Sequence, residues 1–426
     1  MLESVVVLDF LLILDLGLIL FFGVLGSFLL KKIGVPEILG FLLVGLLGNI
    51  LLRGNYFSSD LHAFLNITVA VTLGFVGFHL GSEIDWKTIR SMSKKVFVIL
   101  LFEAIGTFVL VTIVVFLVTQ QVVLAFVFGA LSSATAPAGT AVVFFEYDAK
   151  GPLTTTVMFI LALDDVVSII LTDIATDFAS LYYTDATIDI ISLFLPVVID
   201  VSASIILGVT VGLFSSLLLN RVQNHGELIV LIVGSVLVCI GVAAVFNLSL
   251  ILPSMVFGVT VASLVHTPEP PHKLFDETYL LASPIIATFF VLIGLTLDLT
   301  SLSIIGILGL IYIVARTIAK TIGASIGSYV VKADPNVTKY LGPCLYSQAG
   351  VALGLAVLIA EHFTWLSTQI SDVALSNEVL MAGALVLNTI TATTIVFQIF
   401  GPIAIKWAIV RSGETQKEEE GIEESL

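Results

Sequence analysis

Residues 152–182 read PLTTTVMFILALDDVVSIILTDIATDFASLY, an apolar stretch interrupted near its middle by two adjacent acids, Asp164 and Asp165. As a helix, the stretch is long enough to cross the roughly 30 Å hydrocarbon core of a bilayer. A charge at the bilayer centre costs at least about 2.5–3.5 kcal/mol, so ionisable groups inside a membrane helix are functional candidates by default. The stretch therefore predicts a membrane-spanning fold and also the place where its chemistry lies.

The rest of the chain also favours the bilayer as its solvent. Of its 426 residues, 58% are hydrophobic and 12% are charged, whereas an ordinary soluble domain carries roughly 25% charged residues. Apolar runs recur along nearly the whole length. The first run, from about Val5 to Leu30, is too long for a signal peptide and has no basic segment before it, so we expect a retained span. We predict an all-α polytopic protein of the inner membrane, with the lipid bilayer as its partner.

Composition argues against several other classes of protein. The net charge of −15 leaves no basic stripe that could neutralise the phosphates of a nucleic acid. Cys239 and Cys344 lie far apart in apolar stretches, without a ligand-spaced Cys/His cluster, so neither a disulfide framework nor a structural metal is expected. We expect no cofactor. The segment Ser412–Leu426 is expected to be an acidic, disordered tail on the cytoplasmic side.

Polar and Pro/Gly-marked breaks divide the chain into about thirteen spans. The spans are residues 5–30, 36–52, 63–80, 96–118, 121–145, 152–182, 188–219, 227–246, 249–265, 278–297, 302–331, 338–360 and 378–410.

The basic residues predict the orientation of these spans. If the odd-numbered connections face the cytoplasm, that side collects 14 of the 17 basic residues and the other side only Arg53. The 14 are Lys31, Lys32, Lys87, Arg90, Lys94, Lys95, Lys150, Arg221, Lys273, Lys332, Lys339, Lys406, Arg411 and Lys417. Cytoplasmic loops are enriched in Lys and Arg, so we expect the N-terminus outside and the C-terminus inside.

Thirteen spans divide into six, a linker span and six. Each span of the second half comes seven spans after its counterpart in the first half. Because seven is odd, the two counterparts cross the membrane in opposite directions, and the two halves form an inverted repeat. Such transporters place their site near the midplane, where broken helices face each other. Small and polar residues interrupt corresponding spans at 132–140 and 346–351. We predict two crossed discontinuous helices there, although small residues also serve ordinary packing between membrane helices.

The depth of the charged residues links the two halves. Asp165 lies about 18 Å from the cytoplasmic end of its span and Lys320 about 17 Å from the same side, at 1.5 Å per helical residue. Adjacent buried carboxylates repel each other and resist being ionised together, whereas a nearby ammonium favours an ionised carboxylate. We therefore expect the aspartate pair to lie beside Lys320 and to hold either one small cation or protons, but not both.

Other polar residues in the spans are weaker candidates. Glu103 and Arg316 have complementary charge, and we expect them to form a structural ion pair. Ser132 and Gln348 lie in the two interrupted segments and are secondary site candidates.

Seven short motifs, taken in order, carry a resemblance that covers nearly the full chain. They are residues 34–40 (GVPEILG), 81–85 (GSEID), 134–138 (ATAPA), 149–153 (AKGPL) with 163–165 (LDD), 290–294 (FVLIG), 320–324 (KTIGA) and 347–350 (SQAG). In this order they resemble the monovalent cation:proton antiporter superfamily, on the branch of the NapA-type, NhaA-type and Kef-type exchangers.

The resemblance implies a role for each part of the chain. Asp165 would be the principal site for cation and proton, Asp164 would pair with Lys320, and Thr135 would add an oxygen ligand from the broken helix. Residues 96–182 and 302–411 would form a moving core, and residues 1–95 and 227–301 a dimerising scaffold joined through a linker at 183–226. The activity would be exchange of Na+, or Li+ as surrogate, for H+, serving pH homeostasis. If entering Na+ takes Asp164 away from Lys320, we expect the lysine to release its proton as well, so that exchange would be electrogenic, with two H+ for one Na+.

Two departures from the family pattern bear on mechanism and selectivity. Many relatives carry an aspartate where this chain has Ala136, so its role in balancing the helix ends must be absent or met elsewhere, for example by Glu103. Kef-type potassium systems usually show Gln-Asp in place of Asp164-Asp165 and carry a nucleotide-binding domain. Na+ is therefore preferred, and K+/H+ antiport or Na+-coupled symport of an organic anion are the alternatives.

An enzyme and a passive channel are the alternatives from other classes. Intramembrane aspartyl proteases use two membrane aspartates, but on separate helices and with a Gly-x-Gly-Asp signature that is absent from this sequence. We therefore expect no enzyme. A channel would need no mobile proton site, and a flux assay separates it from an exchanger.

Overall fold

The computed structural model describes residues 2–31, 37–52, 59–83, 86, 90, 94–184, 190–222, 224–246, 248–265, 271–296 and 302–415, and all regular structure in them is helical. Some sequence expectations fall outside these residues. They are positions 34–36 and 84–85 of the first two motifs, the basic residues Lys32, Arg53, Lys87 and Lys417, and residues 416–426 of the tail.

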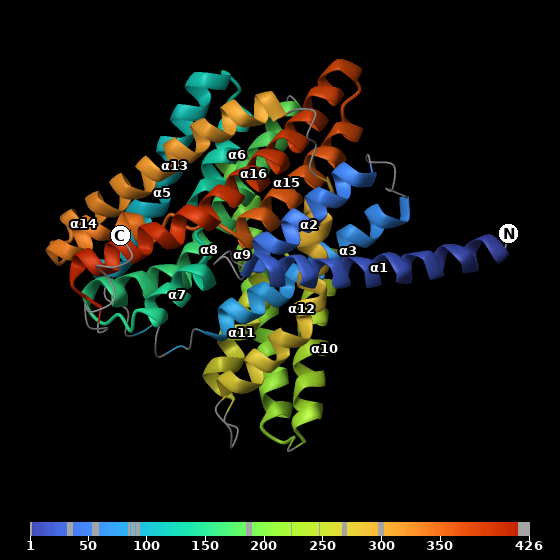
Figure 1. Cartoon of the computed structure of the whole chain (residues 1–426), viewed down its shortest axis with the longest axis horizontal. Coiled ribbons are helices and arrows are strands. Elements are labelled where there is room, and N and C mark those ends of the chain that lie inside the picture. Colours follow the sequence, from blue (N-terminus) through green and yellow to red (C-terminus); the bar gives the residue numbers. More distant parts are fainter. Residues whose placement is uncertain are drawn as a thin grey trace. The chain divides into compact units, whose positions relative to one another are not determined.

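The chain forms two compact units, each built from two separated parts of the sequence: Met1–Arg90 with Val198–Thr300, and Ser91–Val197 with Ser301–Leu426. Unit 1 contains α1 (Leu2–Lys31), α2 (Glu37–Leu52), α3 (Ser59–Ser82), most of α9 (Ile190–Leu219), α10 (His225–Val245), α11 (Leu252–Leu264) and α12 (Pro271–Thr296). Unit 2 contains α5 (Lys94–Thr119), α6 (Val122–Ser133), α7 (Pro137–Glu146), α8 (Pro152–Tyr183), α13 (Leu302–Val330), α14 (Pro335–Cys344), α15 (Gly350–Gln369) and α16 (Val373–Ser412) (Figure 1).

These helices account for the thirteen predicted spans, with α6 and α7 sharing the fifth and α14 and α15 the twelfth. Eight described helices are long and apolar enough to cross a membrane, and several others are shorter apolar helices. The twelfth span is longer than predicted and ends at Gln369 instead of residue 360. The polar pair Glu361-His362 does not end it, because a helix satisfies its backbone hydrogen bonds within its own segment whatever the polarity of its side chains.

The two repeats interleave inside each unit. In unit 1, the second helix of one repeat packs against the third of the other, giving the pairs α2 with α12 and α3 with α11. In unit 2, the equivalent helices α5 and α13 pack directly on each other. This pairing is the pattern expected for two copies related by a pseudo-two-fold axis, as an inverted repeat requires.

Small residues allow the closest of these contacts in unit 1. A Cβ atom added to Gly45 of α2 would lie 2.0 Å from the carbonyl oxygen of Val291, and one added to Gly294 of α12 would lie 2.2 Å from that of Leu42. The backbones of α2 and α12 therefore touch. Such approach favours association in lipid, where burial of apolar side chains gives no driving force between helices.

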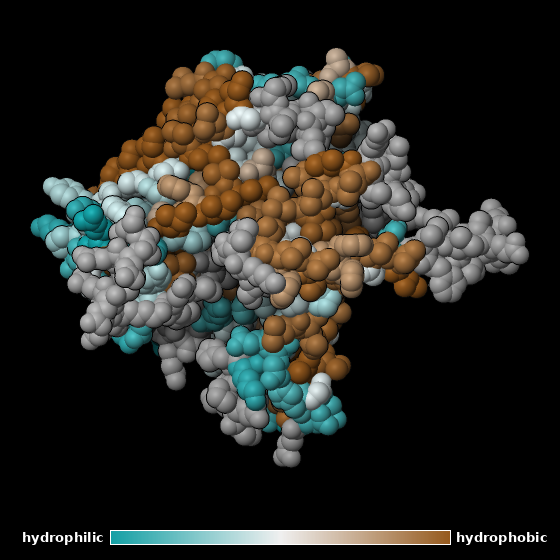
Figure 2. All heavy atoms as spheres, viewed as in Figure 1, coloured by the Kyte–Doolittle hydropathy of each residue, from teal (hydrophilic) through white to brown (hydrophobic). Residues whose placement is uncertain are grey.

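The helix α13 is polar toward the protein and apolar toward its surroundings, the reverse of a water-soluble helix. Ile307, Leu310, Val314 and Ile318 recur at helical spacing and are 49–67% exposed. On the opposite side of the same helix, Arg316 and Lys320 are fully buried. Apolar side chains accordingly cover much of the visible surface (Figure 2). The outer face of α13 is therefore suited to contact with lipid hydrocarbon, and its inner face carries the buried charges.

The start of the C-terminal tail is ordered, contrary to expectation. Glu414 is only 5% exposed, and its carboxylate accepts hydrogen bonds from the backbone N–H groups of Leu153 at 2.7 Å and Thr154 at 2.8 Å. The first N–H groups of a helix lack partners within that helix and attract a negative charge. Glu414 therefore caps α8, which the prediction of a solvated charge run did not foresee.

Gly294→Ala should lower the thermal stability of the purified protein, because the added methyl group forces α2 and α12 apart. Overpacking of this kind costs about 1–3 kcal/mol. Gly241→Ala is the matched control, since no atom lies within 4 Å of a Cβ added there. The melting temperatures are compared in a thermal shift assay. If Gly294→Ala melts at the same temperature as the control, the close contact of α2 and α12 does not contribute to thermal stability.

Candidate functional site

The first broken helix is interrupted for local reasons. The residues after Ser133 leave the helical conformation, with Ala134 extended at φ −61° and ψ 137°. A residue that precedes proline avoids the helical region, which disfavours a helix at Ala136. Pro137 then starts α7, because the first position of a helix needs no N–H partner. The chain thus forms two half-helices joined by three residues.

The second break crosses the first. The helix α14 ends at Cys344, directly after Pro343, and α15 begins at Gly350. The backbone N–H of Ala136 donates to the carbonyl oxygen of Ser347 at 3.0 Å. This bond joins the two interrupted segments to each other, as the prediction of crossed discontinuous helices requires.

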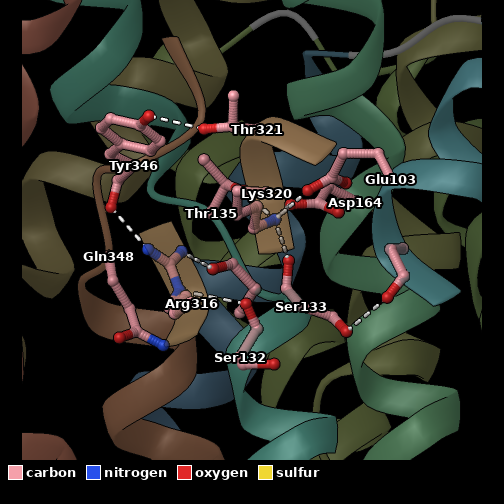
Figure 3. A network of polar contacts seen from close by, with 12 residues as sticks. Glu103, Ser132, Ser133, Thr135, Asp164, Arg316, Lys320, Thr321, Tyr346 and Gln348 are labelled. Atoms are coloured by element: carbon pink, nitrogen blue, oxygen red, sulfur yellow. Dashed lines mark hydrogen bonds and ion pairs between the residues drawn. The ribbon is translucent and has the colours of Figure 1, made fainter. Parts of the chain in front are cut away.

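Arg316 of α13 binds backbone carbonyl groups of both interruptions (Figure 3). Its Nε donates to Ser132 O at 3.0 Å and its Nη2 to Ala134 O at 2.6 Å. Its Nη1 donates to Tyr346 O at 2.6 Å, and Nη2 lies 3.5 Å from Ser347 O. The C-terminal carbonyl groups of a helix lack partners and carry partial negative charge. One guanidinium therefore neutralises the ends of α6 and α14 together.

Lys320, one turn further along α13, has four oxygen neighbours. Its Nζ atom lies 2.5 Å from Ser133 O and 2.8 Å from Thr135 Oγ1. It also lies 2.6 Å from Glu103 Oε1 and 3.3 Å from Asp164 Oδ2. All of these groups are buried. The contact with Asp164 is the longest of the four, so this carboxylate is the one that the lysine holds least closely (Figure 3).

The two aspartates on α8 differ in their surroundings. Both are buried, at 0% and 1% exposure. Oδ1 of Asp164 and both carboxylate oxygens of Asp165 have no hydrogen-bond partner within the part of the chain that the structure describes. Buried polar groups normally have a partner, and an exception calls for an explanation such as a functional role or an ion. Asp165 is thus available to a proton or to a cation.

Two polar side chains fix the second break. The side-chain amide of Gln348 donates to Leu131 O and to the hydroxyl of Tyr312, both at 2.9 Å. The amide of Gln398 donates to Gln348 O at 3.1 Å. Ser132 takes part through its carbonyl group, while its hydroxyl bonds Gly129 O at 2.6 Å. The secondary candidates Ser132 and Gln348 therefore support the broken helices and make no described contact with the aspartate pair.

One expected pair is wrong. Glu103 forms its ion pair with Lys320 and not with Arg316, whose donors bind carbonyl groups. Sequence separation and depth did not distinguish the two bases, because both lie on the same face of α13. One feature of the sequence could have predicted the observed contacts. Arg316 and Lys320 are one helical turn apart at the depth of the two interruptions, which indicates that both side chains bind the broken helices.

The residues that the structure describes contain no group of three or more His, Cys, Asp or Glu side chains arranged to hold a metal ion. The cluster instead contains three acids, Glu103, Asp164 and Asp165, and two bases, Arg316 and Lys320, all buried. The negative charges exceed the positive ones by one when all five groups are ionised. The cluster can therefore be neutralised by one proton or by one monovalent cation.

A buried titratable cluster at crossed half-helices defines the site of a secondary transporter. The comparison with protein families gives the particular class, because residues 17–411 match the family described as the transmembrane sodium/hydrogen exchanger. The chain belongs to this family. It is a multi-pass membrane protein that carries out cation/proton antiport, and it is a transporter and not an enzyme.

Solved structures share the fold. The sodium proton antiporter MjNhaP1 from Methanocaldococcus jannaschii, in a structure at pH 8, has a TM-score of 0.77 and 17% sequence identity, with 95% of this chain and 99% of that chain covered. A structure of the same antiporter from an electron-microscopy map gives a TM-score of 0.75 at 17% identity, covering 96% and 99%. No curated protein matches this chain.

Arg316→Lys should destabilise the protein although it keeps the charge, because one ammonium cannot reach carbonyl groups of both breaks. Each buried acceptor left without a partner costs about 1–3 kcal/mol. The apparent melting temperature in detergent should therefore fall clearly. Arg221→Lys, at an exposed position, serves as the control and should melt like the wild type. If both variants melt alike, the guanidinium is not required to join the half-helices.

Proposed function

We propose that this protein exchanges Na+, with Li+ as a surrogate, for H+, and that both ions bind at Asp165 and Asp164. The observation that carries the proposal is the burial of Asp165 with both carboxylate oxygens free of hydrogen bonds in the described residues, beside an aspartate that Lys320 holds at 3.3 Å. A buried ionised carboxylate without a partner is costly, so it takes up either a proton or a cation.

The two ions compete because they use the same oxygens. Na+ requires ionised carboxylates, whereas a proton on Asp165 removes that charge. Thr135 would add an oxygen ligand. Its hydroxyl lies at the break of the first helix, where it accepts a hydrogen bond from Lys320 Nζ at 2.8 Å. Adjacent carboxylates on one helix create a strong local field, which favours Na+ and Li+ over the larger K+.

Alternating access would follow from a change in position of unit 2, which contains the whole cluster. We propose unit 1 as the scaffold that forms a homodimer. The asymmetry of the basic residues supports an N-terminus outside and a C-terminus in the cytoplasm.

We further propose that exchange is electrogenic, with two protons moved per Na+. When Na+ draws Asp164 away, Lys320 loses one of its two carboxyl neighbours, and the cluster around it releases a second proton in addition to that from Asp165. One net charge per cycle couples to the membrane potential by about 2.3 kcal/mol per 100 mV.

Asp165→Asn should abolish exchange while leaving the protein folded, because an amide carries neither a proton nor the charge that Na+ needs. The measurement is cation-induced pH change in everted vesicles, tested separately with Na+, Li+ and K+. Asp372→Asn is the control, since asparagine caps a helix as well as aspartate does, and Asp372 caps α16 on an exposed surface. Near-normal Na+-driven proton flux in Asp165→Asn would refute the site, and equal responses to K+ and Na+ in wild type would refute the selectivity.

Electrogenic exchange should respond to the membrane potential. Na+-driven proton transport in proteoliposomes should become faster when a K+/valinomycin clamp removes the potential that transport itself builds. Lys320→Gln should lower the melting temperature and alter or abolish this response, because Asp164 loses its cation. Wild-type exchange that is indifferent to the clamp would contradict the two-proton scheme.

A further inference from the structure

Glu103 is the third acid of the cluster, and neither the aspartate pair nor the helix crossing uses it directly. It lies on α5, is fully buried, and its Oε1 atom is 2.6 Å from Lys320 Nζ. Apart from this ion pair, its carboxylate oxygens have no hydrogen-bond partner within the described residues. The contact depends on a close approach of two helices, since a Cβ atom added to Gly323 of α13 would lie 3.0 Å from Glu103 Cα.

The surroundings of Lys320 indicate that its ammonium keeps its proton throughout the cycle. Besides the two carboxylates, Nζ donates to Ser133 O and to Thr135 Oγ1. Ser133 is the last residue of α6, and the C-terminal end of a helix carries partial negative charge that stabilises a cation. Two neutral acceptors and a helix end therefore solvate the ammonium even when Asp164 leaves.

Among the described residues, α13, α6 and α8 pack most extensively against α5, and the charged groups around Glu103 come from α13 and α8. The helix α13 contributes Lys320 and Arg316, and α8 contributes Asp164 and Asp165. The helix α6 has no charged side chain and contributes only the carbonyl groups of its end. Arg316 donates to carbonyl groups, so the base that contacts both Glu103 and Asp164 is Lys320. When Lys320 pairs with Asp164, an ionised Glu103 would be a buried anion without a cation of its own, which favours its protonated form.

We propose, on the basis of the function proposed above, that Glu103 rather than Lys320 holds the second proton of the cycle. In the proton-loaded state, Asp165 and Glu103 are both protonated and Lys320 pairs with Asp164. When Na+ binds Asp164 and Asp165, both protons leave, and Lys320 pairs with the ionised Glu103. Two protons leave for one Na+ that enters, so the net charge of the cluster falls by one, as electrogenic exchange requires.

The experiment counts protons and protonated acids on the purified protein in detergent. A pH-indicator dye should show two protons released per Na+ bound by the wild type and one by Glu103→Gln, which should still bind Na+ through the aspartates. Infrared difference spectra on addition of Na+ should show loss of two carboxylic-acid C=O bands in the wild type and of one in Glu103→Gln. Glu378→Gln is the matched control, because Glu378 is an exposed acid of the same unit, and it should behave like the wild type.

The outcomes separate this inference from the function on which it rests. If wild type and Glu103→Gln both release two protons, Lys320 is the carrier, and only the role of Glu103 is overturned. If the wild type releases one proton, the two-proton scheme fails as well. If Glu103→Gln does not fold, Glu103→Asp, which keeps the acid, replaces it: a change in the frequency of one of the two lost acid bands supports the role of Glu103, and two unchanged bands, or loss of a single band in the wild type, overturn it.

Discussion

The unsatisfied carbonyl groups at the ends of two broken helices are the constraint on which the rest of unit 2 depends. A bilayer offers no water to these groups, so protein donors must reach them. Arg316 supplies the donors by binding Ser132 O and Ala134 O from one break and Tyr346 O from the other. The same requirement explains why α13 carries two positive charges on its inner face and large apolar side chains on its outer face.

The bases that satisfy the backbone also bring the acids together. Lys320 contacts the end of α6 through Ser133 and, from the same nitrogen, contacts Glu103 and Asp164. A buried ion pair is expensive unless its remaining hydrogen bonds are satisfied. The end of α6 provides such a bond for the ammonium of Lys320, whereas Asp164 Oδ1 and Glu103 Oε2 have no hydrogen-bond partner within the described residues. The fold and the proposed chemistry therefore meet at one atom, because a cation bound at Asp164, as proposed, would act on the same ammonium group that supports the broken helix.

Sites outside the cluster hold its supporting helices in register. Glu414 caps the start of α8, the helix that carries both aspartates, and Gly323 lets α5 approach α13 closely enough for Glu103 to reach Lys320. Both residues act on the backbone, because Glu414 binds N–H groups of α8 and Gly323 allows close contact with the backbone of α5. They position the helices that carry the three acids, and neither residue belongs to the proposed ion site.

The sequence by itself determined the features that depend on hydrophobicity and on distance along a helix. Apolar length defined the spans, the odd offset defined the inverted repeat, and matched depth brought Asp164 and Lys320 within reach of each other. The residues around Pro137 and Gly350 marked both breaks, since proline and glycine act locally. Tertiary structure decided everything that depends on direction around a helix axis or on close approach of two backbones. Depth alone could not tell whether Glu103 faces Arg316 or Lys320, and charge alone could not show that Arg316 binds carbonyl groups or that Glu414 caps α8. Those contacts join residues that are far apart in the chain, and only packing of the helices fixes them.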